Sequence, residues 1–104
     1  MVPNQTAAEE ADSLRQLRSI PGVGVSIARD LLGLGFRRVA ELRGQDPEEL
    51  YERLCRQQGM HVDRCMLYVF RCAVYFAETE DPEPELLRWW SWKDGGAAYR
   101  GPRP

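Results

Sequence analysis

The sequence has few residues of the kinds that mark exported, metal-binding or membrane proteins. It holds one histidine and three cysteines, and no CxxC pair occurs among them. An odd cysteine count without paired spacing indicates reduced thiols rather than a disulfide framework. Uncharged apolar stretches such as residues 65–70 are far too short to span a bilayer. Because residues 1–12 also lack the basic start and apolar run of a signal peptide, we expect a cytoplasmic bacterial protein without membrane contact.

Lysine is nearly absent, since Lys93 is the sole lysine among 14 basic residues. The formal net charge is −2, which is unusual for a protein that binds nucleic acid. The charges are unevenly placed, however: both flanks are acidic, whereas residues 13–76 contain more arginines than acidic residues. A weakly basic body permits contact with phosphates but does not require it.

Apolar residues recur at helical spacing along most of the chain, which predicts an all-α fold. The clearest helix begins at Pro47, with Asp46 as its N-cap and Glu49 completing a pattern like a capping box. Residues 57–59 end that helix. The other expected helices cover residues 12–20, 25–32, 36–42, 62–77 and 85–93. We expect one domain over residues 12–94, a disordered leader over residues 1–11 and a disordered tail over residues 95–104.

A glycine turn separates the first two predicted helices. Pro21 ends the first helix, and Gly22 and Gly24 can adopt positive φ and leave room for a close neighbour. Val23 is expected to point inward as a plug. The second helix then begins with unpaired amides that face outward, and these can bind an anion together with the positive end of the helix dipole.

An internal repeat at an offset of 37 residues indicates a second hairpin of the same kind. It pairs Leu17, Gly22, Val23 and Ala28 with Leu54, Gly59, Met60 and Cys65. The two turns are expected near residues 20–25 and 57–62. The second copy is degenerate, because Gln58 replaces the proline and His61 stands at the place of Gly24.

The stretch over residues 17–31 resembles the helix-hairpin-helix motif of DNA repair and recombination proteins. In those families two such motifs and a connector helix form a five-helix unit, so the resemblance implies a tandem helix-hairpin-helix (SAM-like) bundle, here with an added short C-terminal aromatic helix. The segments that begin at Ile20, Gly44, His61, Tyr68 and Trp89 are similar to the small bacterial pathogenicity locus family, some of whose members are labelled mitomycin resistance proteins.

This resemblance and the anion site together predict a module that binds the backbone of duplex DNA without reading its sequence. The alternative is a protein-interaction module of the same fold that binds no DNA. Val25 favours the alternative, because DNA-binding members often have a basic residue at this position. The candidate DNA-binding residues are Gly22, Val23, Gly24, Val25, Ser26, Arg29, Gly59, His61 and Arg64.

The predicted helix over residues 62–77 is apolar on two sides, so two different elements must cover it. The tryptophan segment is the nearest second cover, and a homodimer partner is another. We therefore expect Trp89, Trp90 and Trp92 to pack on this helix, the alternative being a stacking platform or a partner contact. A narrow polar stripe remains as a solvated face or a contact surface; it consists of Arg64, Tyr68, Arg71 and Tyr75.

Neither a metal centre nor a catalytic site is expected. Cys55, His61, Cys65 and Cys72 invite a zinc hypothesis, but cysteines on an apolar helix face usually act as small core residues. A pair of His61 and Cys65 would need an oxyanion site, and none is recognisable. We therefore expect no enzymatic activity and no cofactor.

Overall fold

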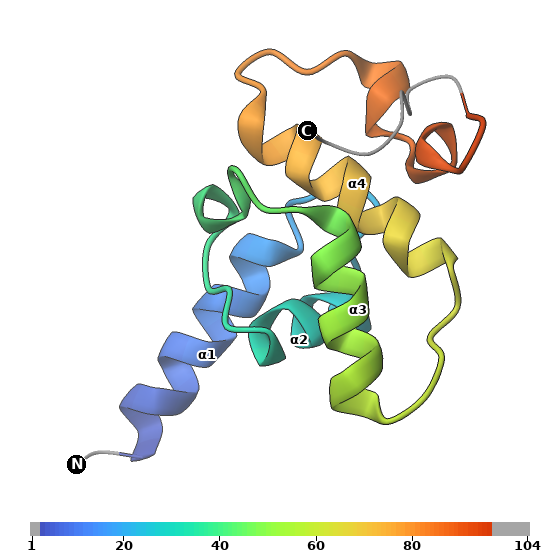
Figure 1. The fold of residues 1–104 in the computed structure, drawn as a ribbon. Helices are drawn as coiled ribbons and strands as arrows, with labels where there is room; N and C mark the ends of the chain where they lie inside the picture. Colours follow the sequence, from blue (N-terminus) through green and yellow to red (C-terminus); the bar gives the residue numbers. More distant parts are fainter. Residues whose placement is uncertain (1–2, 97–104) are drawn as a thin grey trace.

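Four α-helices and three short 3₁₀ helices make up residues 3–96, the part of the chain that the computed structural model describes, with side chains from residue 7 onward (Figure 1). The elements are α1 (Pro3–Leu17), α2 (Val25–Gly33), η1 (Val39–Leu42), α3 (Pro47–Gln58), α4 (Cys65–Glu78), η2 (Pro84–Leu87) and η3 (Trp89–Trp92). No strand occurs in these residues, so the all-α prediction is confirmed. Within the same range, no helix is long and apolar enough to cross a membrane.

Helix α1 begins nine residues before the predicted start of the first helix, at Pro3 rather than near Asp12. The prediction of a disordered leader is therefore wrong for residues 3–11, while residues 1–2 lie outside the described part. Residues 7–11 read Ala-Ala-Glu-Glu-Ala, all strong helix formers, and proline is favoured in the first turn. Residues 7–11 are exposed, and this half of α1 projects from the body (Figure 1).

Helix α4 lies at the centre of the packing. It contacts α3 and η1, and also the two C-terminal 3₁₀ helices. The prediction that two elements cover this helix is therefore confirmed, and the second cover comes from the chain itself. Phe70, Cys72, Ala73 and Val74 are at most 1% exposed, so the middle of α4 is fully removed from water.

Helix α3 begins and ends as predicted. The carboxylate of Asp46 accepts a hydrogen bond from the amide of Glu48 at 3.0 Å, and Pro47 is the first helical residue. Gly59 ends the helix in the left-handed conformation, with φ of +63°. The predicted connector helix is shorter than expected, because only Val39–Leu42 forms a 3₁₀ turn.

Residues 83–94 form a segment that we call the C-terminal strap, and they do not make the single helix predicted over residues 85–93. The strap consists of η2 and η3, with Arg88 in extended conformation between them. Aromatic residues have modest helix propensity, and prolines at positions 82 and 84 restrict the backbone before them. Of the predicted tail, Gly95 and Gly96 are described, and residues 97–104 lie outside the described part.

Candidate nucleic-acid interface

The first hairpin has the internal plug that the sequence predicts. Val23 is only 6% exposed, and its amide donates to the carbonyl of Ile20 at 3.0 Å, which closes the turn after α1. Gly22 has φ of +85°, a conformation that favours glycine. Gly24 differs from the prediction, because it is extended with φ of −94°. The backbone conformation at this position therefore does not require glycine.

The start of α2 is open to solvent. Gly24 is its N-cap, and no side chain caps this helix. A Cβ atom on Gly24 would meet nothing within 4 Å. Because the first-turn amides of a helix have no partner inside it, they remain available to an anion here. The structure brings together five exposed candidate residues around this end, namely Gly22, Gly24, Val25, Ser26 and Arg29.

The second hairpin lacks the plug of the first. Met60, which corresponds to Val23 in the repeat, is 61% exposed. The chain after Gly59 remains non-helical, and α4 begins at Cys65 rather than near Val62. The hydroxyl of Tyr51 donates to the carbonyl of Val62, and this bond ties the turn to α3. The repeat thus predicts a second bend between helices but not its geometry.

The start of α4 is occupied by a carboxylate of the chain itself. Asp63 Oδ1 accepts from the amide of Cys65 at 2.8 Å, and this hydrogen bond lowers the pKa of Asp63. An anionic cap repels a second anion at the same helix end. The expected clamp from amides near Gly59 and His61 therefore does not fit this geometry, although both residues are exposed. Asp63 stands two residues before an apolar run and could have been identified as a cap from the sequence.

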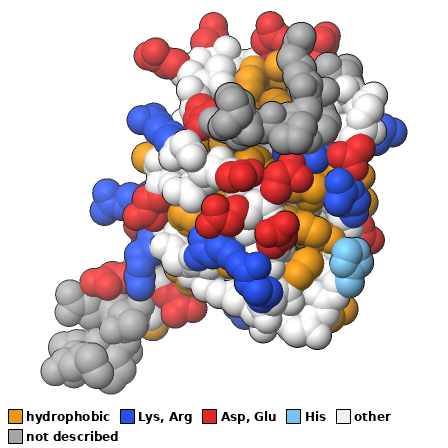
Figure 2. Space-filling view, viewed as in Figure 1, with side chains coloured by type: hydrophobic (Ala, Val, Ile, Leu, Met, Phe, Trp, Pro, Cys, Tyr) orange, Lys and Arg blue, Asp and Glu red, His pale blue; other side chains and the backbone are white. Residues whose placement is uncertain are grey.

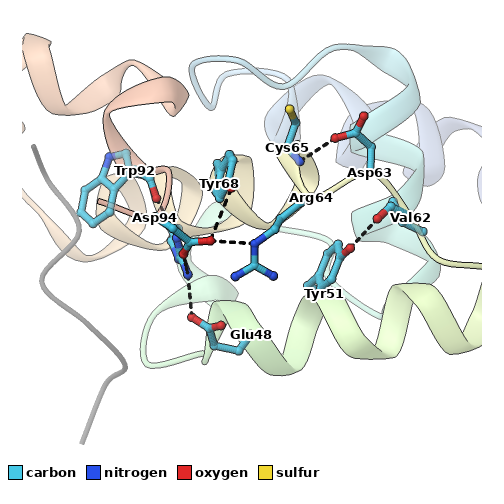
Figure 3. Close-up of polar contacts among 10 residues, drawn as sticks. Glu48, Tyr51, Val62, Asp63, Arg64, Cys65, Tyr68, Trp92 and Asp94 are labelled. Atoms are coloured by element: carbon cyan, nitrogen blue, oxygen red, sulfur yellow. Dashed lines mark hydrogen bonds and ion pairs between the residues drawn. The ribbon is translucent and has the colours of Figure 1, made fainter. Parts of the chain in front are cut away.

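The polar stripe of α4 contacts the C-terminal strap (Figure 3). Arg64 Nε donates to Asp94 Oδ2 at 2.7 Å, and the Tyr68 hydroxyl donates to the same oxygen at 3.5 Å. Near the other end of the helix, the hydroxyl of Tyr75 accepts from the amide of Glu83 at 3.0 Å. The stripe therefore joins two parts of one chain.

Arg71 is the centre of these contacts. Its side chain is 3% exposed and lies between α3, α4 and the strap. Its guanidinium donates to the carbonyl of Trp92 at 2.8 Å and forms ion pairs with Glu48 at 3.1 Å and Asp94 at 3.0 Å. The hydrogen bonds from Arg64 and Arg71 lower the pKa of Asp94, with Arg64 as the larger cause.

Two of the three tryptophans pack as predicted. Trp89 lies against the core, and the Trp92 ring stacks at a tilt on Tyr75 with 5.3 Å between centroids. Trp92 also donates its indole N–H to the carbonyl of Leu86 at 2.7 Å. Trp90 differs, because it is 51% exposed. The Trp90 and Trp89 rings pack edge to face with 5.7 Å between their centroids, so Trp90 contacts a tryptophan that itself lies against the core.

The three cysteines lie in different surroundings. Cys72 is buried under the strap, and burial raises the pKa of its thiol to about 11. Cys65 is exposed, and its hydrogen bond with the side chain of Asp63 raises the pKa of its thiol. Cys55 accepts from the amide of Val62 at 3.4 Å. Within residues 3–96, no group of three or more His, Cys, Asp or Glu side chains could hold a metal ion.

Acidic and basic side chains are interleaved on the face shown in Figure 2, so neither forms a continuous patch there. A hollow of about 400 Å³ opens beside the second hairpin. Its lining contains two arginines and an imidazole beside two carboxylates, namely Arg56, Arg64, His61, Glu48 and Glu52. This face therefore offers individual arginines to a ligand rather than a continuous basic surface.

When compared with known proteins, the sequence matches a curated relative and a family. The chain is 38% identical over 74 residues to "Mitomycin resistance protein McrB" of Streptomyces lavendulae, which covers 71% of this chain and 67% of the relative. No solved structure matches significantly. The sequence pattern of the pathogenicity locus family, Cdd1, matches residues 10–97. These residues include both hairpins, α4 and the strap, and the chain therefore belongs to the pathogenicity locus family.

Proposed function

We propose that this protein is a cytoplasmic, non-enzymatic module that binds the phosphate backbone of duplex DNA without reading its sequence. In this proposal the elements from α1 to α4 correspond to the tandem helix-hairpin-helix arrangement, with η1 as the connector. The first hairpin holds a phosphate through its backbone amides, and the second offers the side chain of Arg64 instead of amides.

One observation carries the proposal: the start of α2 is exposed, and no side chain caps it. The open space at Gly24 allows a phosphate oxygen to approach the amides of the first turn. Ser26 offers a hydroxyl at the same end, and Arg29 lies one turn further along the helix. Backbone amides contact every phosphate alike, which is why such a site does not discriminate between base sequences.

The proposal is tested by fluorescence anisotropy with two unrelated duplexes of equal length. The expected result is weak binding with equal affinity for both, which falls steeply as salt rises. Gly24→Leu should abolish binding, because its side chain fills the space in front of the amides while φ of −94° remains accessible to leucine.

Gly33→Leu is the matched control, since it places the same side chain at the other end of α2, where a Cβ would make only an ordinary contact with Gln57. It should bind as the wild type does. Circular dichroism must show that both variants are folded. If the wild type binds neither duplex at low salt, the proposal is wrong.

A second candidate function is self-association or protein binding through exposed apolar side chains. Trp90 is 51% and Met60 is 61% exposed, so each offers apolar surface to a partner. Sedimentation at increasing concentration tests the homodimer directly. A dimer that Trp90→Ala converts to monomer supports this function, whereas a strict monomer contradicts self-association.

A further inference from the structure

Arg64 is one of the candidate DNA-binding residues, but the structure engages it within the chain. Its side chain is 51% exposed, so water and ligands reach it. Its Nε atom nevertheless donates to Asp94 Oδ2 at 2.7 Å, the length of a charge-assisted hydrogen bond (Figure 3). A carboxylate oxygen and a phosphate oxygen make the same kind of bond to a guanidinium. Asp94 thus occupies the place that a backbone phosphate would take at Arg64.

The strap presents Asp94 at this position for a structural reason. Arg71, which is buried, holds Asp94 Oδ1 at 3.0 Å and the carbonyl of Trp92 at 2.8 Å. Buried Arg71 therefore holds the end of the strap against the core, while exposed Arg64 binds the same carboxylate at the surface. Asp94 itself is 45% exposed, so an incoming anion can compete with it.

The space beside Arg64 can admit such an anion. The hollow of about 400 Å³ at the second hairpin is lined by Arg64, Arg56 and His61. Glu48 and Glu52 also line it, so two arginines stand against two glutamates in this lining. Asp94 adds one more negative charge at Arg64, and its removal would lower the repulsion that an incoming anion meets there.

We propose that Asp94 is an internal competitor of DNA: the end of the C-terminal strap holds Arg64 and thereby lowers the affinity for phosphate, and a DNA backbone displaces it. This inference rests on the proposed function and describes how the strap would regulate DNA binding. The strap and the nucleic acid are alternative partners of one guanidinium. Because the competition costs part of the binding free energy, DNA affinity of the wild type is lower than the exposed arginines alone would give.

The test compares Asp94→Asn with Asp12→Asn in the duplex-binding assay at constant ionic strength. Both changes remove one carboxylate that pairs with an exposed arginine, but Asp12 pairs with Arg15 on α1, far along the chain from the strap, whereas Asp94 pairs with Arg64 and also with buried Arg71. Asp94→Asn should bind DNA about five-fold more tightly than the wild type, the lower range of typical coupling between sites. Asp12→Asn should show only the small gain from the change in net charge.

A second pair of variants assigns the gain to Arg64. In an Arg64→Gln background, Asp94→Asn should no longer raise DNA affinity, since the guanidinium that it frees is absent. Equal gains from Asp94→Asn and Asp12→Asn, or a gain that persists without Arg64, would overturn the inference while leaving the proposed function intact. If no variant in the set binds DNA, the proposed function fails and this inference fails with it.

Discussion

Trp89 lies against the glycine turn of the first hairpin: its Cδ1 atom is 3.5 Å from the position that a Cβ atom would take on Gly22. The strap therefore contacts both hairpin regions, the first through this ring and the second through Asp94. A distance of 3.5 Å is an ordinary van der Waals contact, so a methyl group at position 22 would fit beside the ring. The left-handed backbone of Gly22, rather than crowding, decides the cost of a substitution there.

The first prediction separates the two glycines of this turn. Gly22→Ala should lower the free energy of unfolding by about 1–2 kcal/mol, because alanine must adopt φ of +85°. Gly24→Ala should change it by less than about 0.5 kcal/mol, since its backbone is extended and its surroundings are open. Urea unfolding of the two variants measures the difference, and equal losses would contradict the described backbone.

The second prediction concerns the N-cap of α3. Asp46→Ala should lower the free energy of unfolding by about 1 kcal/mol, because the amide of Glu48 loses its hydrogen-bond acceptor. Asp46→Asn keeps an oxygen acceptor and should retain most of this stability. Thermal unfolding followed by circular dichroism gives the comparison. An alanine variant as stable as the wild type would show that the cap contributes nothing.

The third prediction restores the basic residue that DNA-binding helix-hairpin-helix proteins often have after the second glycine. Val25 is 46% exposed, so Val25→Lys should leave the fold unchanged. It should strengthen duplex binding and steepen the dependence of log affinity on log salt by about 0.9, the value for one added phosphate contact. Ala40→Lys adds the same charge on η1 and serves as the control. Similar effects from both lysines would mean that α2 does not contact the backbone.

The fourth prediction uses the ion pairs of Asp94. The pKa of Asp94 is lower in the folded protein than its ordinary value of 3.8, because Arg64 and Arg71 favour the charged form. Its contribution to stability is therefore fully present above that ordinary value and is lost as pH falls through the lower, folded value. The wild type should exceed Asp94→Asn in unfolding free energy at pH 7, and this difference should shrink below about pH 4. A difference that stays constant down to pH 2 would contradict the ion pairs.

Some of the fold follows from local signals in the sequence. Asp46, Pro47 and Gly59 set the limits of α3 through their own backbone chemistry, which needs no tertiary context. The inward position of Val23 follows from the glycine turn, and the two-sided apolar pattern of α4 follows from periodicity. The extension of α1 was missed because an acidic, weakly amphipathic segment resembles a disordered leader, although residues 7–11 have high helix propensity.

The contacts of Arg64 and Arg71 with the strap could not be derived from the sequence, because they join residues 21 to 30 positions apart. Arg64 and Arg71 have the spacing of a solvated stripe, and nothing local shows that Asp94 pairs with both. The repeat was misleading in a specific way: it predicted a copy of the first hairpin, whereas Asp63 caps α4 and Met60 faces solvent. The open start of α2, by contrast, was correctly predicted from Pro21, Gly22 and Gly24.

The burial of Arg71 has a consequence for where the domain can be shortened. Two carboxylates from different elements pair with Arg71, Glu48 on α3 and Asp94 at the end of the strap. The proline-rich stretch over residues 81–84 looks like a suitable place to truncate. A chain that stopped there would keep all four α-helices but would lose the strap that packs on α4 and the carboxylate of Asp94 that pairs with Arg71. Truncation at the prolines would therefore remove contacts that cover the centre of the domain, whereas truncation after Asp94 would keep them.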